Sequence, residues 1–166
     1  MARISIMDIC DGITATFHGL MITLNAGSPA VALIAQSYDE LTEGIQDAPV
    51  LQILPTNSEV DAQTDTDRTT FKGCVKDGKY SFDCIGYARQ RSQLAEDFEA
   101  SIRMWDALEA IMEEVGTDCD PATGTCAYFG VAGIKGITWT AIGRVAKSYG
   151  GVNFVGPDMN IIIEVF

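Results

Sequence analysis

The stretch Phe71-Lys-Gly-Cys-Val-Lys-Asp-Gly-Lys-Tyr-Ser-Phe-Asp-Cys84 gives the clearest indication of fold in this sequence of 166 residues. Its centre, Asp77-Gly78, is a residue pair typical of a two-residue turn between antiparallel strands. Apolar and polar residues alternate on both sides of the turn, as expected for a hairpin that covers a core with one face. The apolar face would carry Phe71, Val75, Tyr80, Phe82 and Cys84.

The other face of this predicted hairpin is polar and rich in lysine. A turn at Asp77-Gly78 places Lys76 opposite Lys79, and Cys74 opposite Ser81. We therefore expect Cys74 and Cys84 on opposite faces, where no disulfide can join them. The polar face would consist of Thr70, Lys72, Cys74, Lys76, Lys79, Ser81 and Asp83.

A long helix is predicted after the hairpin. Ser92 is a suitable N-cap residue, and apolar residues then follow at steps of three and four. This spacing predicts one buried stripe, with an acidic face turned to water. The stripe would consist of Leu94, Phe98, Ile102, Trp105, Leu108, Ile111, Met112 and Val115.

The N-terminal part predicts a first helix. Apolar residues recur with helical spacing from Ile6 to Leu24, and Asn25-Ala-Gly-Ser-Pro29 would end the helix. The apolar stretch of residues 30–35 fits either kind of element.

Two prolines then frame a short predicted strand, Val50–Leu54, which Pro55 would close. Residues 56–68 predict an acidic loop. This loop lacks the glycine and the glutamate that a calcium-binding loop needs at its sixth and twelfth positions.

The C-terminal part predicts strands over Ile137–Lys147, Val152–Val155 and Asn160–Phe166, with a break at Gly156-Pro157. The whole order predicts a single α+β domain over residues 1–166. We expect a mainly antiparallel sheet with a protruding hairpin, flanked by the N-terminal helix and the long central helix.

The net charge of −12 argues against a surface that binds phosphate or anionic lipid, since both require clustered Lys and Arg. No secretion signal or apolar run long enough to span a membrane is recognisable. We expect a protein that is made in a cytoplasm and has no membrane partner. The five cysteines, an odd number, predict free thiols, although Cys119 and Cys126 bracket a loop that a disulfide could close.

No pattern in the sequence predicts catalysis. His18 is the only histidine, and neither a phosphate-binding glycine loop nor a metal-ligand spacing is present. We therefore predict a protein that is not an enzyme and has no cofactor or metal. The arginines Arg68, Arg89 and Arg91 have two interpretations: they pair with acidic residues of their own chain, or they reach a neighbouring subunit.

The order of several segments resembles the tail terminator (tail completion) proteins of long-tailed bacteriophages and related particles. The resemblance is carried by Gly44–Pro55, Asp67-Arg-Thr-Thr-Phe-Lys-Gly73, Tyr87-Ala-Arg-Gln-Arg-Ser-Gln-Leu-Ala-Glu-Asp97, Trp139, Arg144 and Phe154-Val-Gly156. It covers nearly the whole chain. The loop with Cys119 and Cys126 looks like an insertion relative to that family.

This resemblance implies a virion structural protein, assembled in the host cytoplasm. Such proteins form a ring, here expected to be hexameric, that caps the tail tube and joins it to the head or neck connector. DNA passes through the ring without specific binding. The expected partners are copies of the chain, the tail tube protein and the connector protein. Interface residues would include Arg68, Lys72, Lys76, Lys79, Arg89 and Arg91.

Two alternatives stay open at this point. The first is a head-completion or head-to-tail adaptor protein of the neck, which differs from a terminator in its partner. The second, from another class, is a small-molecule-binding or regulatory domain with a pocket on its sheet. Such a pocket would be lined by Phe71, Tyr80, Phe82, Trp105 and Trp139.

Overall fold

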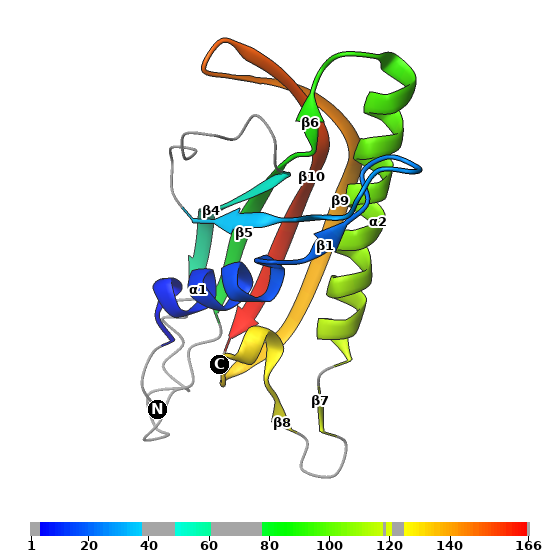
Figure 1. Cartoon of the computed structure of the whole chain (residues 1–166). Helices are drawn as coiled ribbons and strands as arrows, with labels where there is room; N and C mark the ends of the chain where they lie inside the picture. Colours follow the sequence, from blue (N-terminus) through cyan, green and yellow to red (C-terminus); the bar gives the residue numbers. More distant parts are fainter. Residues whose placement is uncertain (1–3, 38–48, 61–77, 118, 121–124, 166) are drawn as a thin grey trace, which may run out of the picture.

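Two α-helices and a six-stranded sheet form most of the computed structural model, which describes residues 4–37, 49–60, 78–117, 119–120 and 125–165 (Figure 1). In chain order the elements are α1 (Ile6–Phe17), β1 (Met21–Ile22), β2 (Val31–Ala32), β3 (Ile34–Gln36), β4 (Val50–Val60), β5 (Gly78–Tyr87), β6 (Arg89–Gln90), α2 (Leu94–Gly116), β7 (Cys119–Asp120), β8 (Thr125–Cys126), η3 (Tyr128–Gly130), β9 (Ile134–Tyr149) and β10 (Val152–Val165).

The main sheet is built around β10. One edge of β10 pairs with β9, and its other edge pairs first with β6 and then with β5. β4 lies beyond β5, and β3 runs parallel to β4. All the other described pairs of this sheet are antiparallel, so the prediction of an α+β fold with a mainly antiparallel sheet is confirmed.

Both helices cover the same face of this sheet. α1 packs on β3 and β4, and α2 runs along β9 and β10 (Figure 1). Alternate residues of the strands point at the helices, because successive side chains of a strand point to opposite faces. The centre of the core consists of Ile9, Ile13, Phe17, Leu51, Ile53, Phe82, Met104, Leu108, Met112, Ile161 and Ile163, which are all buried.

The predicted alternation of Tyr80, Phe82 and Cys84 into the core is confirmed, but the predicted hairpin register is wrong. Tyr80 pairs with Ser58 of β4 on one edge of β5 and with Ile163 of β10 on the other. Both edges of β5 are therefore occupied by β4 and β10 from Gly78 onward, and the strand predicted at residues 70–76 is not one of these partners. Residues 70–76 lie outside the described residues. A turn motif is a local signal, whereas β4 and β10 bring apolar residues that bury against the helices.

Neither Pro55 nor Pro157 ends a strand, contrary to the prediction. β4 continues to Val60 and β10 is continuous through Gly156-Pro157. In both strands the pairing register shifts at the proline. In β10 the bulge leaves Pro157 out of the ladder, so its missing N–H costs no hydrogen bond there. In β4 Pro55 stays opposite Phe82, and the residue left out is Thr56.

The first helix is shorter than predicted. α1 ends at Phe17, and the chain turns at Gly19, whose φ of 82° lies in the left-handed region that favours glycine. Of the predicted helix residues after this point, Met21 belongs to β1, whereas Leu20 and Leu24 lie just outside it. The helical spacing in the sequence therefore continued across the end of a helix into another element.

The face of α2 is rotated relative to the prediction. Leu108, Met112 and Val115 are buried as expected, whereas Leu94 and Phe98 are 68% and 52% exposed. The N-terminal half instead buries Asp97, Ala100, Ser101 and Met104. Ser92 is also not the N-cap residue, because Gln93 occupies that position without a side-chain hydrogen bond.

Some cysteines are free thiols and one is in a disulfide, so each of the two cysteine predictions is confirmed in part. Cys10 and Cys84 are buried free thiols. Cys126 is in a disulfide, and the residue opposite it in the β7–β8 pair is Cys119. Cys74 lies outside the described residues.

Candidate assembly surface

Of the six predicted interface residues, the structure describes three. Arg68, Lys72 and Lys76 lie outside the described residues. Lys79 pairs with Glu164 across β5 and β10, with 3.1 Å between Nζ and Oε1, and both side chains are exposed. Arg89 and Arg91 follow the opposite end of β5. Ten residues of extended chain separate Lys79 from Arg89, about 33 Å at the usual strand rise, so the predicted residues do not form one cluster.

Arg89 is the centre of a polar network at the start of α2. One of its terminal nitrogens donates to Asn25 Oδ1 at 3.0 Å and to Glu96 Oε2 at 2.9 Å. The other donates to Ser92 Oγ at 2.7 Å, and Nε lies 3.4 Å from Asp97 Oδ1. Arg89 thus pairs with acidic residues of its own chain. It thereby fixes the positions of Asn25, Ser92 and the first turns of α2 relative to one another.

Asp97 is the buried member of this network, with 2% of its surface exposed. Besides Arg89, its carboxylate accepts a hydrogen bond from the Ser92 N–H at 3.1 Å. A carboxylate can be removed from water at low cost only when it is paired in this way. The contact therefore locks the β6–α2 connection against the first turns of the helix.

The turn between β1 and β2 is attached to the same helix. Asn25 Nδ2 donates to the Glu96 backbone oxygen at 3.0 Å, and the Ala26 N–H donates to Glu99 Oε1 at 2.9 Å. Glu99 also accepts from Arg103 Nε at 2.8 Å. These bonds join segments more than 70 residues apart in sequence.

A groove of about 410 Å³ lies between the β1–β2 hairpin and the segment that leads from β6 into α2, and it is open to solvent. One wall comes from Leu24, Pro29 and Val31 of the β1–β2 hairpin and the other from residues 89–92. Because the polar network ties both walls to α2, the groove has a defined shape.

Several exposed side chains lie near the start of α2. Leu94 and Phe98 are four residues apart on α2, hence neighbours on its surface, and both are exposed. Arg91 is exposed and, within the described part of the chain, makes no ion pair. Aromatic residues and arginines are enriched at protein interfaces. We refer to the groove, with Arg91 in its wall, as the assembly surface. Leu94 and Phe98 do not line it, because helical spacing places Phe98 on the same side of α2 as Trp105, which packs on β9.

We expect the attachment of the β1–β2 turn to be sensitive to acid through Glu99. Hydrogen bonds from the Ala26 N–H and from Arg103 hold the pKa of the Glu99 carboxyl below its ordinary value. A carboxylate with a lowered folded-state pKa stabilises the fold above its unfolded pKa, and this contribution is lost as the pH falls through the folded-state value.

In an NMR titration the Ala26 amide resonance should therefore move with a midpoint below about 4.3, the usual glutamate value. The Glu99→Gln variant should abolish this transition. A midpoint at the ordinary glutamate value, or an unchanged transition in the variant, would show that Glu99 does not hold this turn.

A second polar cluster, which the sequence did not reveal, surrounds Lys147 of β9. Its ammonium donates to the Gly86 oxygen at 2.7 Å, pairs with Asp158 and lies 5.3 Å from the centre of the Tyr87 ring. Burial lowers the pKa of Lys147, and the contact with Asp158 acts in the opposite direction. All three contacts are within the fold, so this lysine joins β9, β10 and the end of β5.

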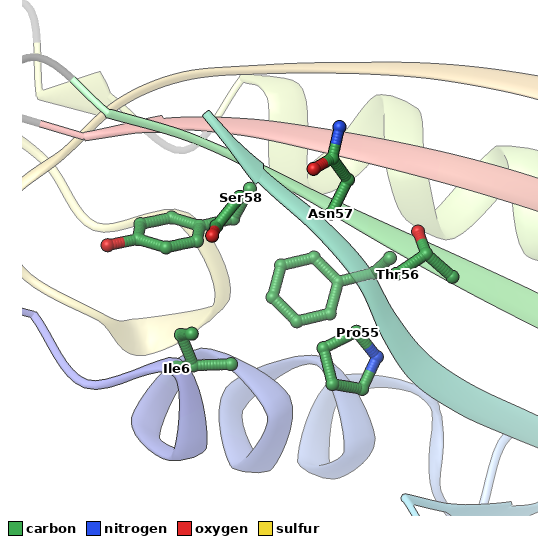
Figure 2. A pocket seen from close by; sticks show the side chains of 7 residues that line it. Ile6, Pro55, Thr56, Asn57 and Ser58 are labelled. Atoms are coloured by element: carbon green, nitrogen blue, oxygen red, sulfur yellow. The ribbon is translucent and has the colours of Figure 1, made fainter. Parts of the chain in front are cut away.

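A shallow depression lies between β4 and the start of α1. Figure 2 shows residues 55–58 of β4 along one side and Ile6 of α1 on the other. Tyr80 and Phe82 of β5 complete the lining, but only 3% and 0% of their surfaces are exposed.

The other aromatic residues predicted to line a common pocket lie elsewhere. The ring of Trp105 packs over Gly143 of β9, and Trp139 lies near Gly116. Phe71 is outside the described residues. The four described aromatic residues of that prediction therefore do not line one pocket.

Within the described residues, no group of His, Cys, Asp and Glu side chains is arranged to hold a metal ion. None of the described helices combines the length and apolar character of a membrane span. No protein-family model matches this sequence, and no curated protein matches it significantly.

Proposed function

We propose that this chain is a structural subunit of a virion, the tail terminator of a long-tailed bacteriophage or related particle. The observation that carries this proposal is the assembly surface. One of its walls consists of residues 89–92, which belong to Tyr87–Asp97, a segment in which the sequence resembles the terminator family. A polar network fixes the shape of this groove, and Leu94 and Phe98 are exposed on the first turns of the adjoining helix, which suits a protein that works by contacting other proteins.

Assembly into a closed ring would require this surface to contact a different patch on the next copy. When a patch on one copy contacts a different patch on the next, the contacts repeat and close into a ring if the rotation permits. A ring of about six copies would cap the tail tube and contact the neck connector. The net charge of −12 favours passage of DNA through its lumen, because carboxylates repel phosphates.

Tail tubes provide the test of this proposal. Tubes would be assembled from the tail tube protein of the same genome, mixed with the gold-labelled chain and imaged by electron microscopy. We expect label at one end of the tubes and an end to tube elongation there. Label only on the head connector would indicate the neck adaptor instead. Absence of label from both would contradict a role at the head–tail junction.

A further inference from the structure

The short helix η3 closes one end of the core. Figure 1 shows this turn in yellow, directly after β8, and it contacts α1, α2 and β9. Its aromatic residues Tyr128 and Phe129 are only 9% and 6% exposed and belong to the main core cluster. The packing at this end of the core therefore depends on η3 keeping its position.

The contact of η3 with α1 is a close backbone approach at Gly12. A Cβ at this position would lie 2.7 Å from the Phe129 carbonyl oxygen and 2.9 Å from Val131 Cγ2. The same segment also approaches Ile4, because a Cβ on Gly133 would lie 2.9 Å from Ile4 Cδ1. Since dispersion contacts weaken within a gap of about 1 Å, a small displacement of η3 opens this packing.

Phe129 does not favour the conformation that it adopts in η3. Its φ of 56° and ψ of 22° lie next to the left-handed helical region, which residues with a Cβ rarely occupy. Such a conformation persists only where the surrounding structure holds it. Gly12 and its neighbours on α1 hold Phe129 from one side. On the other side the chain enters η3 from Cys126, three positions before Phe129.

Cys126 is in a disulfide, and the strand register identifies its partner. Of the five cysteines, Cys10 and Cys84 are free thiols, which leaves Cys74 and Cys119. Cys119 is directly opposite Cys126 in the β7–β8 pair. Opposed residues of an antiparallel pair have Cα atoms about 4.5 to 5.5 Å apart, a separation that a disulfide spans.

We infer that Cys119 and Cys126 form a redox switch that controls whether η3 stays packed on α1. In the disulfide form β7 and β8 are joined just before η3, which fixes the point where the chain enters the strained turn. In the dithiol form this anchor is lost, so Phe129 relaxes to a favoured conformation and η3 leaves Gly12. The switch is a property of the single chain and does not depend on the role proposed above.

The switch operates by thiol–disulfide exchange with a small-molecule disulfide such as oxidised glutathione. The thiolate of one cysteine attacks the glutathione disulfide and releases one glutathione. The thiolate of the other cysteine then attacks the mixed disulfide and releases the second glutathione. Two electrons and two protons pass in total from the cysteine pair to the oxidant. A reducing cytoplasm therefore favours the dithiol form, and an oxidising medium favours the disulfide form.

Two backbone amides inside the turn report its opening. The Gly130 N–H donates to the Ala127 oxygen at 2.9 Å, and the Val131 N–H donates to the Tyr128 oxygen at 3.0 Å. NMR would measure their hydrogen exchange in oxidised glutathione and in dithiothreitol. After reduction we expect both amides to exchange at least about tenfold faster, because local opening exposes them.

The amide of Ile161 is the internal control, because this residue is fully buried on the central strand β10. Its exchange should accelerate by a smaller factor than that of Gly130 and Val131. Equal acceleration of all three amides would show that the disulfide acts only on the unfolded chain, and the switch would be wrong.

Cys119→Ser tests the disulfide partner. In this variant the Gly130 amide should exchange as fast in oxidised glutathione as in dithiothreitol. A thiol titration of the unfolded, unreduced variant should find every remaining cysteine free. A disulfide in this variant would show that Cys126 pairs with Cys74, and exchange that still responds to glutathione would equally overturn the switch.

Gly12→Ala tests the contact from the side of α1. The added methyl group meets the Phe129 carbonyl oxygen, so Gly130 and Val131 should exchange faster even in the oxidised protein. Unchanged exchange of these two amides in the oxidised variant would show that η3 is not held by its contact with α1, contrary to the inference.

Discussion

Replacing Gly156 by alanine should lower the free energy of unfolding by about 3 kcal/mol, because the added methyl group meets backbone. A Cβ at this position would lie 2.7 Å from the Gly86 carbonyl carbon and 2.9 Å from the Ala88 nitrogen, and it would also overlap the Gly86 oxygen. The strands β5 and β10 cross closely here, and neither backbone can move without loosening the sheet. Chemical denaturation monitored by circular dichroism would measure the loss.

The matched control is Gly136→Ala in β9. A Cβ there meets no atom within 4 Å, and the residue has no positive φ. Its unfolding free energy should change by less than about 1 kcal/mol. If both substitutions lowered the free energy of unfolding equally, the cost would come from backbone entropy alone. The close approach of β10 to the end of β5 would then not be what requires glycine at position 156.

Replacing Asp97 by alanine should cost about 3 kcal/mol, because it breaks a buried ion pair from one side. Arg89 would lose its buried partner, and the Ser92 N–H would lose its acceptor. Since this network holds the start of α2 in place, the variant should also weaken assembly. Denaturation and light scattering on the same samples would measure both effects.

Glu96→Ala is the control for that variant. Glu96 also pairs with Arg89, but 47% of its side chain is exposed. Exposed ion pairs contribute about 1 kcal/mol or less, so this variant should be nearly as stable as the wild type. A loss for Glu96→Ala as large as that for Asp97→Ala would show that burial of Asp97 is not what stabilises the network.

The sequence predicted those parts of the fold that depend on short-range pattern. The alternation in Tyr80–Cys84 and the helical spacing of Leu108–Val115 both correspond to burial in the structure. The partner of β5 was predicted wrongly because Asp77-Gly78 describes a turn and not the competing strands. The buried face of α2 was predicted wrongly at its start because Asp97 becomes buried through its pair with Arg89.

The candidate surface was predictable only in part. Arg89 and Arg91 stood out as arginines in an acidic chain, but the sequence did not show that Arg89 would pair with Glu96 and Asp97. Asn25 and Glu99, which shape the groove, are 74 residues apart and carry no local motif. A signal that was available is the crowding of polar residues near the helix start, where a capping network is common. The exposure of Leu94 and Phe98 had no such signal, because apolar residues at helical spacing usually face the core.

The central claim, that this chain acts by closing into a ring, is tested most directly by the solution mass of the purified protein. Light scattering combined with negative-stain images of the same peak would give the mass and the shape. We predict closed rings of about six times the chain mass of 17.9 kDa. A single species of 17.9 kDa at every concentration and in the presence of tail tubes would contradict the claim.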